Sequence, residues 1–381
     1  MSKKSPQLRF EGFTDDWEER KLGEIFNYEQ PTKYIVKSTE YDDNFNTPVL
    51  TAGKSFLLGY TDEISGIKNA TVENPVVIFD DFTTGSHYVD FPFKIKSSAM
   101  KLLSLNDNSD NFYFMFNTLK NIKYVPQSHE RHWISKFSSF EIYKPSQEEQ
   151  QKIGAFFKQL DETIALHQRK LDLLKEQKKG YLQKMFPKNG AKVPELRFEG
   201  FADDWEERKL GELVEQIIRE VPKPNKPYYR MSVRSHAKGT FKQFVDNPEN
   251  VAMDKLFVVK KDDLVVNITF AWEHAIAVVN EENDGLLVSH RFPTYRADGK
   301  SDIEFLHHVV SKENFRRKLE FISPGGAGRN RVLNKKDFLK LKIFVPKIEE
   351  QQKIGSFFKQ LDNTIALHQR KLDLLKEQKK G

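Results

Sequence analysis

Two segments of this 381-residue chain occur twice, almost letter for letter, and each pair brackets a stretch that does not repeat. The short segment, residues 8–24, returns as residues 196–212 with 16 of 17 positions identical. The long segment, Glu148–Gly180, returns as Glu349–Gly381 with two substitutions. A constant frame that holds two different inserts indicates a protein in which two domains on one scaffold recognise two different targets.

The long segment has the period of an amphipathic helix. Its apolar positions step alternately by four and three residues, which is the seam of a heptad repeat. In the two copies the seam consists of Ile153, Phe157, Leu160, Ile164, Leu171 and Leu174, and of Ile354, Phe358, Leu361, Ile365, Leu372 and Leu375. A helix with one narrow apolar stripe cannot bury that stripe alone, so we expect the two copies to pack on each other as an antiparallel coiled coil.

Histidine interrupts each seam, at His167 and His368. We interpret both as polar residues that set the register of the pair, in preference to metal ligands or catalytic groups. Each 33-residue segment would span about 50 Å as a helix, at about 1.5 Å per residue. Ser146 and Glu149 form a capping-box pattern at the start of the first copy. The short segment is expected to dock each insert on the frame, as an extended piece, a glycine turn and a short polar helix around Trp17 or Trp205.

The inserts, residues 25–147 and 213–348, contain short runs rich in Val, Ile and Phe that are typical of strands. Residues 111–119 and 303–321 are the expected helices. The fold class is therefore α+β, with two mixed β-rich domains, two long helices and a pseudo-twofold internal repeat. No run approaches 18 uninterrupted apolar residues, there is no apolar leader at the N-terminus, and cysteine is absent, so we expect a cytoplasmic protein without disulfides.

Basic residues gather at the end of each insert. Residues 312–342 hold ten Lys and Arg against three Asp and Glu, and a weaker excess runs through residues 120–144. Such stretches are typical of a surface that binds a phosphate backbone, although a solvated basic face is an equally good reading of charge alone. Polar and aromatic side chains on expected loops, in these stretches and in two others (residues 83–87 and 272–291), are suited to base edges and phosphates. The candidate DNA-binding residues are Thr83, Thr84, Ser86, His87, His129, Arg131, His132, Lys136, Trp272, His274, Arg291, Arg329, Asn330 and Arg331.

Several patterns that would indicate an enzyme fail. Gly53, Lys54 and Ser55 follow a strand-like run, but Pro48 stands where a phosphate-binding loop needs its first glycine. Asp80, Asp81, Glu141 and Lys144 would make a nuclease-like cluster only if Glu141 and Lys144 faced the same way, and three residues apart in a strand they do not. We therefore predict no catalytic residues and no metal site in this chain.

The order of the segments closely resembles the DNA-specificity subunit of type I restriction–modification systems. The resemblance covers the whole chain, and the motif that carries it is EQQKIG..FKQLD..I..H, present twice. It implies two target-recognition domains, each reading one half of a bipartite site in double-stranded DNA, with the paired helices as a ruler across the unspecified spacer. It also implies two methyltransferase subunits and two restriction/translocase subunits as partners, with S-adenosylmethionine, ATP and Mg²⁺ bound by those partners and no cofactor in this chain.

On this reading the first target-recognition domain is residues 1–147, the first spacer helix 148–186, a linker 187–195, the second target-recognition domain 196–348 and the second spacer helix 349–381. The alternative is a coiled-coil adaptor that presents two domains to protein partners. The two differ in their response to salt, because specific binding to duplex DNA weakens steeply as ionic strength rises.

Overall fold

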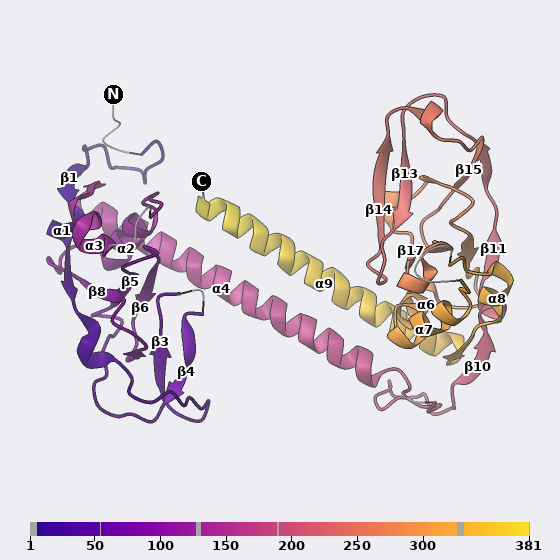
Figure 1. Ribbon diagram of the computed structural model, residues 1–381, viewed down its shortest axis with the longest axis horizontal. Coiled ribbons are helices and arrows are strands. Elements are labelled where there is room, and N and C mark those ends of the chain that lie inside the picture. Colours follow the sequence, from indigo (N-terminus) through magenta and orange to yellow (C-terminus); the bar gives the residue numbers. More distant parts are fainter. Residues whose placement is uncertain (1–5, 54, 127–130, 189, 326–330, 381) are drawn as a thin grey trace. The chain divides into compact units, whose positions relative to one another are not determined.

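The computed structural model describes residues 6–53, 55–126, 131–188, 190–325 and 331–380 (Figure 1). The chain divides into two compact units. The first is Met1–Leu166 together with Leu374–Gly381, and the second is His167–Asp373. Each unit holds one insert and parts of both long helices, and each is described by itself below.

In the first unit the strands and helices follow the apolar runs of the first insert. The strands are β1 (Glu18–Lys21), β2 (Phe26–Glu29), β3 (Thr47–Leu50), β4 (Leu57–Thr61), β5 (Val76–Asp80), β6 (Ser86–Val89), β7 (Lys94–Ile95), β8 (Met100–Leu105) and β9 (Glu141–Lys144). The helices are α1 (Leu22–Ile25), α2 (Phe112–Lys120), α3 (His132–Ser135) and α4 (Gln147–Lys184), with 3-10 turns at Pro31–Tyr34 and Phe137–Ser139.

The second unit is built from β10 (Glu206–Lys209), β11 (Glu215–Ile217), β12 (Glu220–Pro222), β13 (Tyr228–Val233), β14 (Thr240–Val245), β15 (Lys255–Val258), β16 (Leu264–Val266), β17 (Ile276–Val278), β18 (Leu287–Val288), β19 (Thr294–Arg296) and β20 (Lys342–Val345). Its helices are α5 (Leu210–Leu213), α6 (Ile303–Val310), α7 (Glu313–Phe321), α8 (Lys335–Lys340) and α9 (Ile348–Lys380), with 3-10 turns at Pro248–Asn250, Ala271–Glu273 and Glu281–Asn283.

The two inserts share one sheet topology although their sequences do not align. The first contains an antiparallel sheet in the order β2-β8-β5-β6, and the second contains β11-β19-β16-β17, which has the same order and the same pairing directions. A two-stranded antiparallel sheet also recurs, as β1-β9 and as β10-β20. The third sheet of each insert differs, because β4-β3-β7 has three strands and β12-β15-β18-β13-β14 has five.

The central strand of each shared sheet is buried on both faces. In β5, Val77 and Phe79 pack with α2, and Val76 and Ile78 pack on the other side toward the second sheet. In β16, Val265 faces one cluster of apolar residues while its two neighbours face the other. A strand covered on both sides has a continuous apolar run in its sequence, as these two strands do.

The long helices pair antiparallel within each unit. In the second unit, His167 Nδ1 lies 3.3 Å from His368 Nδ1, and farther along α4 the ring of Tyr181 meets Phe357, which lies earlier in α9. In the first unit, Lys379 near the end of α9 pairs with Asp161. The expected antiparallel coiled coil is therefore present.

Some seam residues lie along the helix pair, and others pack in the core of a domain. Leu160, Leu171, Leu174 and Leu372 are buried, and Phe157, Ile164, Leu361, Ile365 and Leu375 are half-buried. At the start of each helix the seam turns instead toward its own domain. Ile153 packs against the core of the first insert, and Ile354 and Phe358 belong to the core of the second.

The repeated segments meet at a joint that is built twice. Arg9 donates two hydrogen bonds to Glu149, at 2.9 and 2.7 Å, and Arg197 does the same to Glu350, at 2.8 and 2.7 Å. The capping box predicted at the first joint is therefore only half formed. The amide of Glu149 lies 3.4 Å from Ser146 Oγ, but its carboxylate turns to Arg9.

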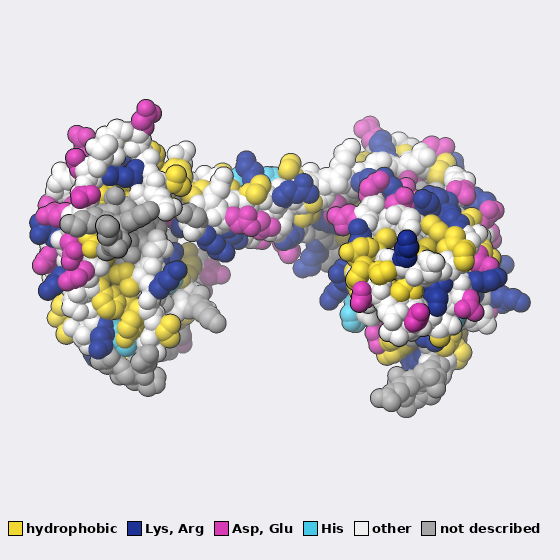
Figure 2. Space-filling model, turned by 90° about the horizontal axis from the view of Figure 1, so that it is seen from above, with side chains coloured by type: hydrophobic (Ala, Val, Ile, Leu, Met, Phe, Trp, Pro, Cys, Tyr) yellow, Lys and Arg dark blue, Asp and Glu magenta, His cyan; other side chains and the backbone are white. Residues whose placement is uncertain are grey.

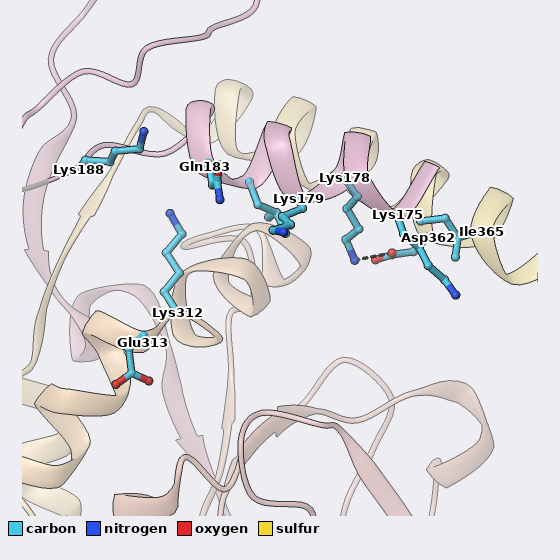
Figure 3. Close-up of a pocket in the computed structure, with 10 residues that line it drawn as sticks. Lys175, Lys178, Lys179, Gln183, Lys188, Lys312, Glu313, Asp362 and Ile365 are labelled. Carbon is cyan, nitrogen blue, oxygen red and sulfur yellow. Dashed lines mark hydrogen bonds and ion pairs between the residues drawn. The ribbon is translucent and has the colours of Figure 1, made fainter. Parts of the chain in front are cut away.

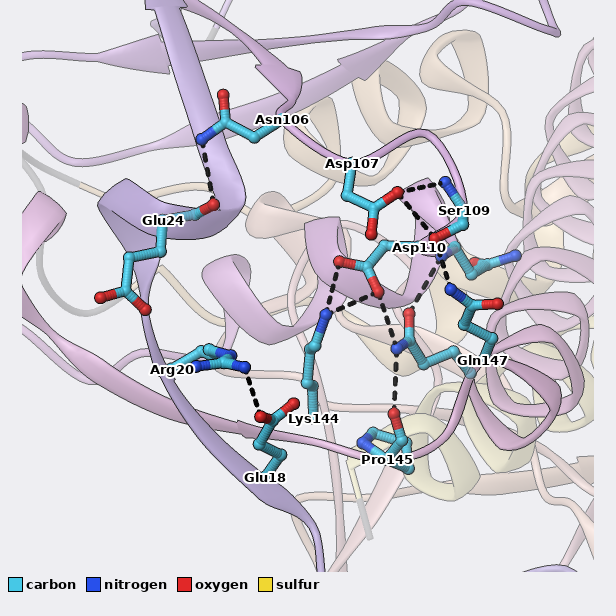
Figure 4. Close-up of polar contacts among 12 residues, drawn as sticks. Glu18, Arg20, Glu24, Asn106, Asp107, Ser109, Asp110, Lys144, Pro145 and Gln147 are labelled. Carbon is cyan, nitrogen blue, oxygen red and sulfur yellow. Dashed lines mark hydrogen bonds and ion pairs between the residues drawn. The ribbon is translucent and has the colours of Figure 1, made fainter.

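Glutamine completes each joint. The carboxamide of Gln150 accepts a hydrogen bond from the amide of Asn111, at 3.0 Å, and donates to the carbonyl of Pro145. Gln351 repeats both contacts with Asp302 and Pro346. In the first unit Asp110 also holds Lys144, with both of its carboxylate oxygens 2.9 Å from the ammonium nitrogen (Figure 4). The repeated EEQQKIG motif thus fastens each helix to the first residues of α2 or α6.

Two local expectations were wrong. Trp17 precedes the strand β1, which pairs with β9, so no short polar helix forms around it. The helix expected over residues 303–321 is two helices, because Lys312 adopts an extended conformation, with φ −81° and ψ 148°. The break lets α6 bury Phe305 while α7 turns to bury Phe315 and Leu319.

Candidate nucleic-acid interface

In the first domain, the loop between β5 and β6 lies against the segment that begins α3. The amide of His132 donates to the carbonyl of Asp81 at 2.9 Å, and the amide of Trp133 donates to the Asp81 carboxylate at 3.0 Å. These bonds hold the start of α3, which follows the exposed Arg131, against the loop that carries the exposed Thr83. Residues more than 40 positions apart therefore form one polar surface beyond the end of β5.

The base of this surface contains a buried ion pair. Lys101 Nζ lies 3.4 Å from Asp81 Oδ2, and the two side chains are 0% and 1% exposed. The ammonium also lies 5.2 Å from the centre of the Tyr28 ring. A charge buried this deeply is costly without a partner, so the pair fixes Asp81 and, through it, the start of α3.

The second domain has an equivalent surface. The amide of Leu333 donates to the carbonyl of Ile268 at 2.8 Å, in the loop that follows β16, and the amide of Ile268 donates to the carbonyl of Arg291. The guanidinium of Arg331 lies 5.5 Å from the centre of the Trp272 ring and 3.3 Å from Glu320. Arg331 therefore lies against Trp272, and the backbone of Arg291 is bonded to the same loop.

The two surfaces occupy the same place in the same topology. The first surface consists of the loop between β5 and β6 and the segment before α3. The second consists of the loop between β16 and β17 and the segment before α8. Each also exposes a phenylalanine in that loop, since Phe82 is 37% and Phe270 47% exposed. The structure thus brings together, in both domains, candidate residues that the sequence had placed on separate loops.

Two of the histidine predictions, at His132 and His274, need correction, and His87 is partly covered. His132 and His274 are buried, and the ring of His274 bonds the carbonyl of Val310 at 2.7 Å, so neither ring is presented to a ligand on the surface. His87 stacks on Phe56 with ring centres 4.3 Å apart, and its Nε2 lies 3.2 Å from the carbonyl of Ala52. Burial lowers the pKa of His87 and of His274, which favours the neutral ring in both.

The other candidates fall into three groups. Arg131, Lys136, Thr83 and Arg291 are exposed, and Thr84, Trp272 and Arg331 are half-buried. Ser86 is half-buried within β6, where it pairs with Phe79. His129, Arg329 and Asn330 lie outside the described residues.

The acidic cluster that would have suggested a nuclease does not form. Asp81 is committed to Lys101, Asp80 accepts hydrogen bonds from the amides of Phe82 and Thr83, and Lys144 binds Asp110. Across the described ranges, no group of three or more His, Cys, Asp or Glu is close enough to hold a metal ion. None of the described helices is long and apolar enough to cross a membrane.

A basic cavity of about 650 Å³ lies between the second half of α4 and the start of α7 (Figure 3). Its lysines are Lys175, Lys178, Lys179, Lys188 and Lys312. Lys312 Nζ stands 3.8 Å from the centre of the Phe186 ring, and burial lowers the pKa of Lys312 to about 8. The cavity adds positive charge to the side of the second domain where α7 begins.

One basic element escaped the sequence analysis. Residues 221–245, which form β13, β14 and their approaches, contain six Lys and Arg and no Asp or Glu. A count of charge along the whole chain would have found this stretch, because it is longer than any other without an acidic residue in the second insert. On the face shown in Figure 2, Lys and Arg side chains are interspersed with acidic and apolar ones. Local arrangement therefore says more than net charge about where a nucleic acid would bind.

Comparison with known proteins decides the family. The profile of the type I restriction modification DNA specificity domain matches residues 14–176 and again residues 202–377. The chain belongs to the type I restriction–modification DNA-specificity family. The expectation drawn from the repeated motif is confirmed.

The match to relatives in this family extends over most of each chain. The specificity subunit of the type I restriction enzyme EcoR124I/EcoR124II from Escherichia coli is 31% identical over 360 residues, which cover 90% of this chain and 85% of that protein. The MjaVIII specificity subunit from Methanocaldococcus jannaschii is 22% identical over a match that covers 96% of this chain and 91% of that protein. The crystal structure of the S subunit from M. genitalium matches 98% of this chain with a TM-score of 0.62 at 15% identity, so the specificity-subunit fold extends to it.

Membership of this family supports a role of the chain in DNA sequence specificity.

Proposed function

We propose that this chain gives a type I restriction–modification complex its bipartite target, with each domain reading one half of a duplex DNA site. The observation that carries the proposal is the pair of equivalent surfaces, which stand at the same place in the same sheet but present different side chains. In the first domain these include Thr83 and Arg131, and in the second Trp272, Arg291 and Arg331. Arginine can bind guanine bidentately, and threonine can bond to several bases or contact the methyl group of thymine.

The joints support the modular part of the proposal. The contacts of Arg9 with Glu149 and of Arg197 with Glu350 involve only repeated residues, so either insert could be held in the same way. Since α4 and α9 carry the same seam, their length would set the separation of the two half-sites. The helices would then act as a ruler across the bases that are not read.

Repeated exposed leucines support the proposed partners. Leu166 and Leu173 are 64% and 52% exposed on α4, and their counterparts Leu367 and Leu374 are 63% and 56% exposed on α9. Exposed apolar residues that recur at seven-residue spacing on a helix are suited to packing against another helix. We assign this surface to two methyltransferase subunits, which would supply S-adenosylmethionine chemistry, while two restriction/translocase subunits would supply ATP- and Mg²⁺-dependent cleavage.

Duplex binding at several salt concentrations tests the proposal. The full chain, alone and with its methyltransferase subunits, would be mixed with a randomised duplex pool, and the bound DNA sequenced. We expect one motif with two specified halves, and an affinity that falls steeply with salt because phosphate contacts release counterions. Association only with proteins, unaffected by salt and without any enriched duplex, would instead establish the adaptor function.

A further inference from the structure

The hairpin β13–β14 stands at the edge of the five-stranded sheet of the second domain. Strand β13 pairs with β18 on one side and with β14 on the other, which leaves β14 as the last strand. Its stretch of the chain, residues 221–245, carries a formal charge of +6 without a single carboxylate. Such a strip is complementary in charge to a phosphate backbone.

One face of the hairpin carries side chains that can read bases. Arg230 and Gln243 are directly opposite each other in the register, and Arg230 Nε donates to Gln243 Oε1 at 3.0 Å. The bond leaves the two terminal nitrogens of the exposed Arg230 and the amide nitrogen of Gln243 available as donors. Next along this face, the guanidinium of Arg234 lies 5.0 Å from the centre of the Phe241 ring and bonds the carbonyl of Thr240 at 3.1 Å.

The other face of the hairpin has a different role. Met231 and Val233 point away from Arg230 and are buried in an apolar cluster with Val265 and Val288. Lys242 lies opposite Met231 on this second face and is exposed at the edge of the sheet. The hairpin is thus anchored by one face and free on the other.

The turn of the hairpin rests on the segment that carries Trp272. Ser235 Oγ donates to the carboxylate of Glu273 at 2.7 Å, and the amides of His236 and Ala237 donate to the carbonyls of Glu273 and His274 at 2.8 Å. These contacts join the hairpin to the surface of Trp272 and Arg331 within one unit.

We propose that the outward face of β13–β14 enters the major groove of the DNA and reads base edges with Arg230 and Gln243, beside the loop of Trp272. The groove is about 12 Å wide and admits a two-stranded ribbon, in which the strands lie about 4.8 Å apart. Arginine binds the O6 and N7 atoms of guanine, and glutamine binds the N6 and N7 atoms of adenine. The proposal rests on the proposed function and extends it, since it names a base-reading element of the second domain.

The matched test uses the full chain with its methyltransferase subunits and the randomised duplex pool. With Arg230→Ala and Gln243→Ala, we expect one or two positions of one half-site to lose their base preference, with a roughly 10- to 100-fold weaker discrimination there. The other half-site should not change. Arg230→Lys keeps the charge but not the planar fork, so it should relax the same position.

Lys242→Ala is the control, because it removes one positive charge from the opposite face of the same hairpin. It should keep every base preference and at most reduce the salt dependence of binding. Recovery of the parent motif by the Arg230 and Gln243 variants, with parent affinity, would overturn the inference while leaving the proposed function intact. If the parent chain enriched no motif, both the inference about the hairpin and the proposed function would be contradicted.

Discussion

Arg197 and Glu350 form a bidentate ion pair in which the two side chains are 11% and 2% exposed. The arginine comes from the short repeat and the glutamate from the first turn of the second long helix. Arg9 and Glu149 repeat the pair in the first unit, with exposures of 13% and 1%. The two repeated segments of the sequence are therefore connected to each other, and the inserts are held between them.

Removal of the arginine should destabilise the second unit strongly. In Arg197→Ala the buried carboxylate of Glu350 loses its partner, and breaking a buried pair costs about 3 kcal/mol. Arg208→Ala is the matched control, since the Arg208–Glu212 pair is 43% and 46% exposed and should contribute less than about 1 kcal/mol. Urea unfolding of both variants measures the difference. Equal losses of stability would contradict the role of the joint.

Glycine at the start of each long helix permits its close contact with the domain. A Cβ atom on Gly355 would lie 2.2 Å from Asp302 Oδ1, the atom that caps α6. Gly355→Ala should therefore lower the melting temperature by several degrees. Gly180→Ala is the control, because a Cβ there meets nothing within 4 Å, and alanine in a helix should stabilise by about 0.5–1 kcal/mol. A stabilising Gly355→Ala would show that the contact does not matter.

The stability of the folded protein should depend on pH through His167, which lies beside His368. Partial burial, then the charges of Lys371 and His368, lower the pKa of His167 in the folded protein below its unfolded value of about 6.5. The unfolded chain then binds the proton more tightly, so stability should fall as the pH drops below about 6.5 and level off beneath the folded pKa. The double variant His167→Leu/His368→Leu should be more stable near pH 5 and show a flatter profile. Chemical unfolding between pH 5 and 8 measures this, and an unchanged slope would contradict it.

The length of the helix pair offers a further prediction. Seven residues inserted at the same point of the repeat in both α4 and α9 preserve the seam and add about 10 Å of helix. Since base pairs are about 3.4 Å apart, the unspecified gap should grow by about three base pairs. The spacing is read from the motif that the variant enriches, and a gap of the original length would exclude the ruler.

The long helices could be predicted from the sequence because their signal is local. A seam that repeats every seven residues, and a nearly identical second copy, indicate a helix pair without any knowledge of the rest. The apolar runs of β5 and β16 are also a local signal, because burial on both faces makes these strands continuously apolar. The joint could not be foreseen, since Arg9 and Glu149 are 140 positions apart and nothing in either segment marks the other as its partner.

The candidate surfaces were foreseen only in part. The sequence placed Arg131 and Arg331 in basic stretches and Trp272 on another expected loop, and the structure shows that Arg331 lies against Trp272. It could not show that His132 and His274 point inward, because the direction of a side chain in a loop depends on distant contacts such as the carbonyl of Val310. The hairpin of Arg230 was overlooked because its charges are spread over 25 residues instead of being clustered.

The central claim is that each insert recognises one half of the site independently of the other. The most direct test is to exchange one insert. Residues 25–147 would be replaced by the corresponding insert of another family member, with both repeated segments kept, and methylated sites would be mapped in cells that carry the complete system. The account predicts a new sequence in one half of the site, with the other half and the gap unchanged. Changes in both halves, or in neither, would contradict it.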